Sequence, residues 1–268
     1  MKVGRRSSLG LMLALVCVVG LGARCGDDEK PKAAGSTSTS TAPGLRGNLT
    51  VLAAASLSEA FKELGGAFET KNPGTKITFS FDASSALALQ ANNGAPADLF
   101  ASADQNNMKK VTDAGNATAP RVIAQNKLAI IVAKGNPKKI TGLADLNKSS
   151  VSYVLCAPQV PCGKYGAEAL TKAGVKAKPK SLETNVKAVV TKVSGGEVDV
   201  GVGYVTDARA SAASAEGIEI PDQYNVVAEY PMAVLKQSAN ATLASAFLDF
   251  ILTPASQAVL AKHGFVAV

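Results

Sequence analysis

Hydroxyl-bearing and small residues stand at points where a predicted strand or loop runs into a predicted helix. Ser56 and Ser84 follow two apolar runs, small residues open helices near Cys162 and Val186, and Tyr204 ends a further run. The first N–H groups of a helix have no partner within it and lie at the positive end of its dipole. Turns of this kind bind anions. None of the cap positions is Lys or Arg. The pattern therefore indicates a site where neutral groups hold a small dianion.

Ser56 also has a simpler interpretation. Glu59 follows it at the spacing of a capping box, in which the serine would only cap its own helix. Tyr204 likewise has the alternative of a buried core aromatic. Asp207 is expected to cap a helix or orient Tyr204 rather than touch a ligand. The residues alone leave these alternatives open.

Three strand and helix units open the folded part of the chain. A continuous apolar run before Ser56 is typical of a strand buried on both faces. We expect further strands at 76–81 and 97–102. One helix would cover 57–68, a second would begin near residue 84, and a third would follow the 97–102 strand and end at about residue 115. Right-handed crossovers would place such strands in a parallel sheet with helices on both faces. The pattern therefore predicts an α/β fold.

The rest of the chain continues this alternation. We expect strands at 127–133, 151–155, 198–204 and 226–235, and helices at 143–146, 164–172, 181–193 and, after 240, two more separated at Thr253–Pro254. A second set of strand–helix–strand units is therefore nested within the chain.

The N-terminus carries the features of an export signal. Lys2, Arg5 and Arg6 precede an apolar run over 9–22, which is too short to span a bilayer comfortably. The stretch that ends at Cys25 resembles the lipobox of bacterial lipoproteins, although Arg24 stands where a small residue is preferred. We expect a signal peptide over 1–25, an acylated Cys25 and a low-complexity linker over 26–47. A plain secreted protein is the alternative.

Two cysteines lie beyond the signal. Cys156 and Cys162 bracket a short loop, and an exported chain meets oxidising conditions, so we predict a disulfide between them. A thiolate metal site is the weaker alternative, because it would want more Cys or His ligands and His263 is the only histidine.

The charge of the chain does not indicate a nucleic-acid partner. Of 28 basic residues, four lie in the predicted signal, which leaves 24 against 21 acidic residues. A balance of this size, scattered along the chain, excludes a basic binding surface as the main feature.

Four motifs carry a specific resemblance. The stretches Ala-Ala-Ala-Ser-Leu at 53–57, Gly-Ala-Pro-Ala-Asp-Leu-Phe-Ala-Ser-Ala-Asp at 94–104, Val-Pro-Cys-Gly-Lys-Tyr at 160–165 and Gly-Val-Gly-Tyr-Val-Thr-Asp-Ala at 201–208 resemble the molybdate-binding proteins of ABC importers in order and spacing. The resemblance covers residues 48–268. It implies a two-lobed periplasmic-binding-protein (type II) fold, in which each lobe is a mixed, mainly parallel sheet flanked by helices. One lobe would be 48–126 and 227–268, and the other 127–226.

The resemblance also implies a ligand set and partners. In that family two serines, two backbone N–H groups and a tyrosine hydroxyl hold the oxyanion. By position these are Ser56, Ser84, the amides of Cys162 and Val186, and Tyr204, with Ser85 as an alternative to Ser84. The ligand would be molybdate or tungstate, so that molybdenum enters only as part of the bound oxyanion, and no cofactor is expected. We expect a monomer, anchored outside the cytoplasmic membrane or in the periplasm, that delivers its ligand to an ABC permease.

Three alternative functions remain open. A binding protein of the same fold could take sulfate or phosphate, because tetrahedral dianions differ mainly in size and protonation. An enzyme with Ser56 or Cys162 as nucleophile needs a nearby base, yet His263 lies near the chain end, where a charge or packing role is expected. An adhesion or scaffold protein would leave the hydroxyls at the helix starts unexplained.

Overall fold

The computed structural model describes residues 44–268. The predicted signal peptide, the acylation of Cys25 and the linker up to residue 43 lie outside the described residues. Between residues 44 and 268, no single helix is long and apolar enough to cross a membrane, although the bent pair Ala241–Ile251 and Pro254–Lys262 together reach the required length and composition.

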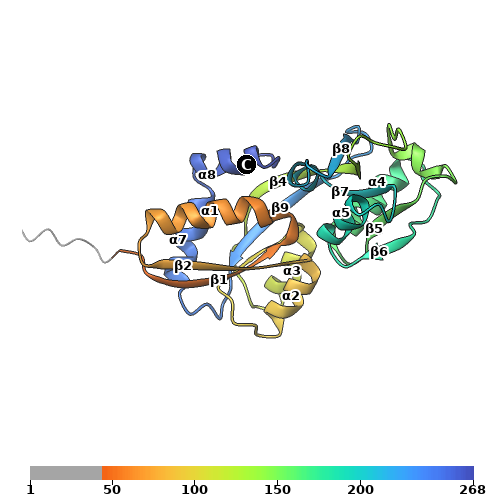
Figure 1. Cartoon of the computed structure of the whole chain (residues 1–268). Helices are drawn as coiled ribbons and strands as arrows, with labels where there is room; N and C mark the ends of the chain where they lie inside the picture. The colour runs from red at the N-terminus through yellow and green to blue at the C-terminus, as the bar shows by residue number, and fades with distance from the viewer. Residues whose placement is uncertain (1–43) are drawn as a thin grey trace, which may run out of the picture. The chain divides into compact units, whose positions relative to one another are not determined.

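Short strands and helices alternate along the described chain (Figure 1). The strands are β1 (Gly47–Ala54), β2 (Thr75–Asp82), β3 (Leu99–Ala101), β4 (Arg121–Ala133), β5 (Tyr153–Cys156), β6 (Ser181–Glu183), β7 (Val200–Tyr204), β8 (Ala215–Glu219) and β9 (Val227–Val234). The helices are α1 (Ser58–Lys71), α2 (Ser84–Asn92), α3 (Gln105–Asp113), α4 (Pro161–Lys172), α5 (Val186–Ser194), α6 (Val205–Ala210), α7 (Ala241–Ile251) and α8 (Pro254–Lys262), with 3-10 turns at Ala55–Leu57 and Leu143–Asn147.

The strands form one mixed sheet in the order β2-β1-β3-β9-β4-β7-β5-β6, with β8 also paired to β4. Strand β4 pairs with different strands along its length. Its first part, from Arg121 to Lys127, pairs with β9, and its second part, from Leu128 to Ala133, pairs with β7 and β8. Pairs within the β1–β3 and β5–β7 groups are parallel, whereas every pair that involves β4 or β9 is antiparallel. The α/β prediction with a mixed sheet is confirmed, but the antiparallel share is larger than we expected.

Helices cover both faces of the β1–β3 group (Figure 1). Helices α1 and α7 lie on one face, where the aromatic rings of Phe61, Phe68 and Phe247 pack against one another. Helices α2 and α3 cover the other face over a separate cluster that contains Leu87, Phe100 and Met108. The turns that end these strands are therefore held between two packed layers.

Two predicted elements differ from the structure. Ser181–Glu183 forms strand β6 rather than the start of a helix, and helix α5 begins at Val186 after Asn185 caps it by accepting from the Ala188 N–H. Strand β4 begins six residues before the predicted strand, and β8 was not predicted. The sequence of β8, Ala-Glu-Gly-Ile-Glu, is polar and resembles that of a loop. Its pairing with β4 stabilises it as a strand.

Candidate functional site

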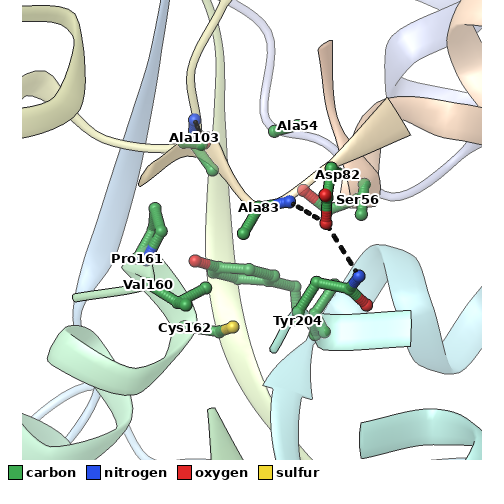
Figure 2. A pocket seen from close by; sticks show the side chains of 13 residues that line it. Ala54, Ser56, Asp82, Ala83, Ala103, Val160, Pro161, Cys162 and Tyr204 are labelled. Carbon is green, nitrogen blue, oxygen red and sulfur yellow. Dashed lines mark hydrogen bonds between the residues drawn. The ribbon is translucent and has the colours of Figure 1, made fainter. Parts of the chain in front are cut away.

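The turns around Ser56, Ser84, Cys162, Val186 and Tyr204 converge on one cavity of about 10 Å³ (Figure 2). This volume holds about one water molecule. Figure 2 shows the Tyr204 side chain between the Val160–Cys162 turn on one side and Ser56, Asp82 and Ala83 on the other. All five residues predicted for the site therefore line the same cavity, and they come from segments up to about 150 residues apart.

Ser56 does not cap helix α1. It lies in the 3-10 turn that follows β1, and the N-terminus of α1 at Leu57 has no side-chain cap. The Ser56 Oγ instead lies 2.8 Å from the Tyr230 hydroxyl. The capping-box interpretation is therefore wrong, because the extra turn places the serine before the helix and directs its hydroxyl to the cavity.

The structure distinguishes Ser84 from Ser85. Ser84 is the first residue of α2, is 1 % exposed and lines the cavity, whereas Ser85 does not. The Ser84 Oγ accepts a hydrogen bond from the backbone N–H of Ala103 at 2.9 Å. Its own O–H proton therefore remains available to a ligand.

Cys162 and Val186 contribute backbone positions at two helix starts. Cys162 follows Pro161, which occupies the first position of α4, and Val186 opens α5. N–H groups in a first turn have no acceptor within their own helix. Among the described residues, neither amide has a protein acceptor within hydrogen-bonding distance. Both are therefore free to donate at the cavity.

A disulfide and a close contact hold the Cys162 turn. Cys156 at the end of β5 and Cys162 are joined by a disulfide, with their Cα atoms 5.6 Å apart. A Cβ on Gly163 would lie 2.0 Å from the Ala157 carbonyl oxygen, so only glycine fits there. Because the cysteines are paired, they do not supply thiolate ligands. Across residues 44–268, no three His, Cys, Asp or Glu side chains are grouped as metal ligands.

Tyr204 has a hydroxyl that is buried but unpartnered. The residue is 1 % exposed, and among the described residues its oxygen has no hydrogen-bond partner. Burial raises the Tyr204 pKa well above its ordinary value, and Tyr230, Tyr165 and Asp207 add to the shift. The hydroxyl therefore stays neutral and remains a donor. Buried donors are rarely left unpaired, so this one indicates a missing acceptor.

Asp207 lies directly behind Tyr204. Its Oδ2 accepts from the Tyr204 backbone N–H at 3.3 Å, as expected for a residue that orients the tyrosine. Its Oδ1 lies 3.4 Å from the Lys187 Nζ but is not aligned for a hydrogen bond. Burial raises the Asp207 pKa to about 6, while Lys187 and the Tyr204 amide oppose the shift.

Sequence reasoning missed two polar residues of the cavity wall. The Asp82 Oδ1 accepts from the Ala83 N–H at 2.7 Å and from the Asn185 Nδ2 at 3.0 Å (Figure 2). Asn185 immediately precedes Val186, and Asp82 lies two residues before Ser84, so closeness to the predicted site residues was the available signal. His263, in contrast, bonds Glu63 at 2.7 Å and is not among the residues of the cavity.

Comparisons with known proteins give a consistent result. A family model described as bacterial extracellular solute-binding protein matches residues 49–266. The molybdate-binding protein ModA of Mycobacterium tuberculosis is 39% identical over 239 residues, which cover 87% of this chain and 91% of that protein. ModA of Escherichia coli is 33% identical over 230 residues, covering 82% and 89% of the two chains.

Solved structures share the fold. The periplasmic molybdate-binding protein of Azotobacter vinelandii superposes with a TM-score of 0.74 at 23% identity, over 82% of this chain and 99% of that one. The sulfate-binding protein SubI of Mycobacterium tuberculosis superposes with a TM-score of 0.76 at 21% identity, over 82% and 87%. At these identities the superpositions support the fold alone.

Proposed function

Because this chain belongs to the family of bacterial extracellular solute-binding proteins, we propose that it captures molybdate in the Tyr204 cavity and delivers it to an ABC permease. The role is binding without catalysis. Relatives that cover most of the chain carry the name molybdate-binding protein, and this supports the choice of ligand.

The observation that carries the proposal is the unpartnered Tyr204 hydroxyl beside two free helix-start amides and two serine hydroxyls. All five groups are hydrogen-bond donors, and a tetrahedral oxyanion carries acceptors on every oxygen. Such charge-assisted bonds contribute roughly 1.5–3 kcal/mol each. Five of them would outweigh the loss of the anion's hydration shell only if they converge, as the cavity arranges.

We propose a division into two lobes, and the pairing of strands β4 and β9 supports it. We place one lobe at 48–126 and 227–268 and the other at 127–226, because β4 changes its partner from β9 to β7 between Lys127 and Leu128. Ser56 and Ser84 then belong to the first lobe, and Cys162, Val186 and Tyr204 to the second. A ligand held by both lobes stabilises the closed form, which is the form that a permease would recognise.

The cavity has less room than an oxyanion needs. We infer that the ligand enters when the lobes separate and that the walls move apart slightly around it. Tungstate carries the same charge and shape, so we expect it to bind as well.

Isothermal titration tests the proposal on the purified chain without its signal. We expect saturable, one-to-one binding of molybdate. Tungstate should displace the bound molybdate, whereas excess sulfate should not. Ser56→Ala should weaken molybdate binding at least about tenfold, because one charge-assisted bond is worth about 1.4 kcal/mol or more.

Ser58→Ala is the matched control. The Ser58 hydroxyl is also buried but bonds Glu59 at 3.2 Å and does not line the cavity. Its affinity should equal that of the wild type. Absence of any molybdate binding by the wild type, or equal affinity in both serine variants, would reject the site.

The finer points of location are proposals as well. We propose a lipid anchor at Cys25 and a monomeric binding unit. Cys25→Ala should move the protein from the membrane fraction to the soluble fraction of an expressing bacterium, while a membrane fraction unchanged by this variant would exclude the anchor. Sedimentation of the soluble chain at the mass of a dimer would exclude the monomer.

A further inference from the structure

A buried chain of hydrogen bonds leads from strand β4 to the cavity. Asn126, Tyr230 and Ser56 are 0 %, 0 % and 6 % exposed. The Asn126 Nδ2 lies 3.3 Å from the Tyr230 hydroxyl, which lies 2.8 Å from the Ser56 Oγ. Tyr230 itself is not among the residues that line the cavity. It can therefore act on a ligand only through Ser56.

We infer the direction of each hydrogen bond in this series from the neighbouring donors and acceptors. The Asn126 Oδ1 accepts from the Lys127 N–H at 3.0 Å, which orients the side-chain amide and leaves Nδ2 to donate. One Nδ2 hydrogen goes to the Thr206 Oγ1 at 2.9 Å and the other to the Tyr230 oxygen. An NH₂ group accepts no hydrogen bond, so among residues 44–268 the recorded acceptor left for the Tyr230 proton is the Ser56 Oγ.

This order leaves one role for Ser56. Its oxygen accepts from Tyr230, and its own proton is therefore directed away from Tyr230, toward the cavity. Burial raises the Tyr230 pKa far above the physiological range, so the tyrosine retains the proton that it donates. Ser84 is held in the same way, because its oxygen accepts from the Ala103 N–H.

We propose that Tyr230 is a positioning residue that holds Ser56 as a hydrogen-bond donor, so that the site favours oxyanions without a proton over oxyanions that carry one. This inference rests on the proposed function. An oxyanion such as molybdate accepts at every oxygen, whereas hydrogen phosphate must also donate one hydrogen bond.

The test is a ratio of two affinities. Molybdate and inorganic phosphate are titrated against the full mature chain at about pH 8, where phosphate is mainly a dianion with one proton. In Tyr230→Phe, the Ser56 hydroxyl is free to turn and accept. Molybdate affinity should fall about tenfold, while phosphate affinity should fall less or rise, so that the preference for molybdate drops at least about threefold.

Asn126→Asp provides a second variant of nearly equal shape. A carboxylate at this position would accept a hydrogen bond from the Tyr230 hydroxyl, and the Tyr230 oxygen would then accept from Ser56. The direction of both hydrogen bonds would be reversed. The added negative charge opposes both dianions equally, so the ratio of affinities remains the readout. It should shift in the same direction as in Tyr230→Phe.

Tyr153→Phe is the matched control. The Tyr153 hydroxyl also makes a hydrogen bond, partly buried, to the Ala177 carbonyl at 2.6 Å, but Tyr153 is not among the cavity residues. The affinity ratio should equal that of the wild type.

The outcomes separate this inference from the proposed function. A wild type that binds no molybdate rejects both. A wild type that binds molybdate, with Tyr230→Phe and Asn126→Asp lowering both affinities by the same factor, overturns only the role of Tyr230, because a merely structural residue would behave in that way. If Tyr230→Phe does not fold, the Asn126→Asp ratio decides alone.

Discussion

The Asp82 carboxylate accepts a hydrogen bond from the Asn185 side chain at 3.0 Å, although 103 residues separate them in the chain. Asp82 ends strand β2 and Asn185 caps helix α5. The bond therefore joins two sides of the cavity. It also places a negative charge on the wall of a site that we propose for a dianion, which should lower the affinity of that site.

Replacement of Asp82 by Asn should tighten oxyanion binding. The amide oxygen of Asn can still accept from Ala83 and Asn185, so the geometry is kept while the charge is removed. Relief of repulsion worth about 1 kcal/mol corresponds to about a fivefold gain in affinity. Titration of molybdate into both proteins measures it. Weaker binding by Asp82→Asn would show that the carboxylate supports the site instead.

Removal of the Tyr204 hydroxyl should separate binding from stability. In Tyr204→Phe, molybdate affinity should fall at least about tenfold, because a charge-assisted bond is lost. The free energy of unfolding of the ligand-free protein should not fall, since the oxygen has no partner among the described residues. Urea unfolding and titration of the same variant give both values.

Tyr153→Phe should show the opposite pattern. Its hydroxyl donates to the Ala177 carbonyl, and the loss should lower the free energy of unfolding by about 1 kcal/mol without changing affinity. A Tyr204→Phe protein that is destabilised as much as Tyr153→Phe would mean that the Tyr204 oxygen has a partner in solution.

The buried Asp207 should make stability depend on pH. Its pKa is raised by burial from 3.8 to about 6 in the folded protein, so the folded state holds a proton that the unfolded state releases. This contribution is fully present below about pH 4 and is lost as the pH rises through 6. Between these values Asp207→Asn should flatten the part of the profile in which stability falls with pH, as measured by urea unfolding.

Lys187 should limit that effect. Its ammonium lies 3.4 Å from the Asp207 Oδ1 and opposes the rise in the Asp207 pKa. Lys187→Met should therefore move the pH-dependent loss of stability to higher pH. The same profile in wild type and Lys187→Met would show that the two charges do not interact.

The Cys156–Cys162 disulfide should stabilise the fold modestly. The bond closes a loop with a sequence separation of 6, and chain entropy for a loop of that length corresponds to about 2 kcal/mol. The double variant Cys156→Ala/Cys162→Ala should lose this amount and bind molybdate more weakly, because the Cys162 amide is less well held. A reducing agent should destabilise the wild type and leave the double variant unchanged. Equal stability of the two proteins would contradict the prediction.

Local patterns predicted most of the elements but not the antiparallel connections. The apolar run before Ser56 and the spacing of valines in α5 require only neighbours in the sequence. Strand β8 alternates weakly and is held by its partner β4, so its own residues carry little signal. Ser181–Glu183 was misassigned for the same reason, because its pairing with β5 lies outside the sequence window.

The residues at the helix starts of the site could be predicted from the sequence, whereas Tyr230, which contacts Ser56 from outside the cavity, could not. Ser56, Cys162 and Tyr204 stand in motifs, Ser84 and Val186 lie near predicted helix starts, and all five line the cavity. Tyr230 lies in an ordinary strand, and nothing in its surroundings in the sequence marks its contact with Ser56, 174 residues away. Contacts of that separation depend on the tertiary fold.

Among the described residues, none of those that line the cavity is Lys or Arg. Dissolved salt weakens attraction between exposed charges far more than hydrogen bonds inside a nearly dry cavity. A protein that works outside the cytoplasm meets dilute and concentrated media in turn. The affinity of this site for a dianion should therefore change little between low and high salt concentration.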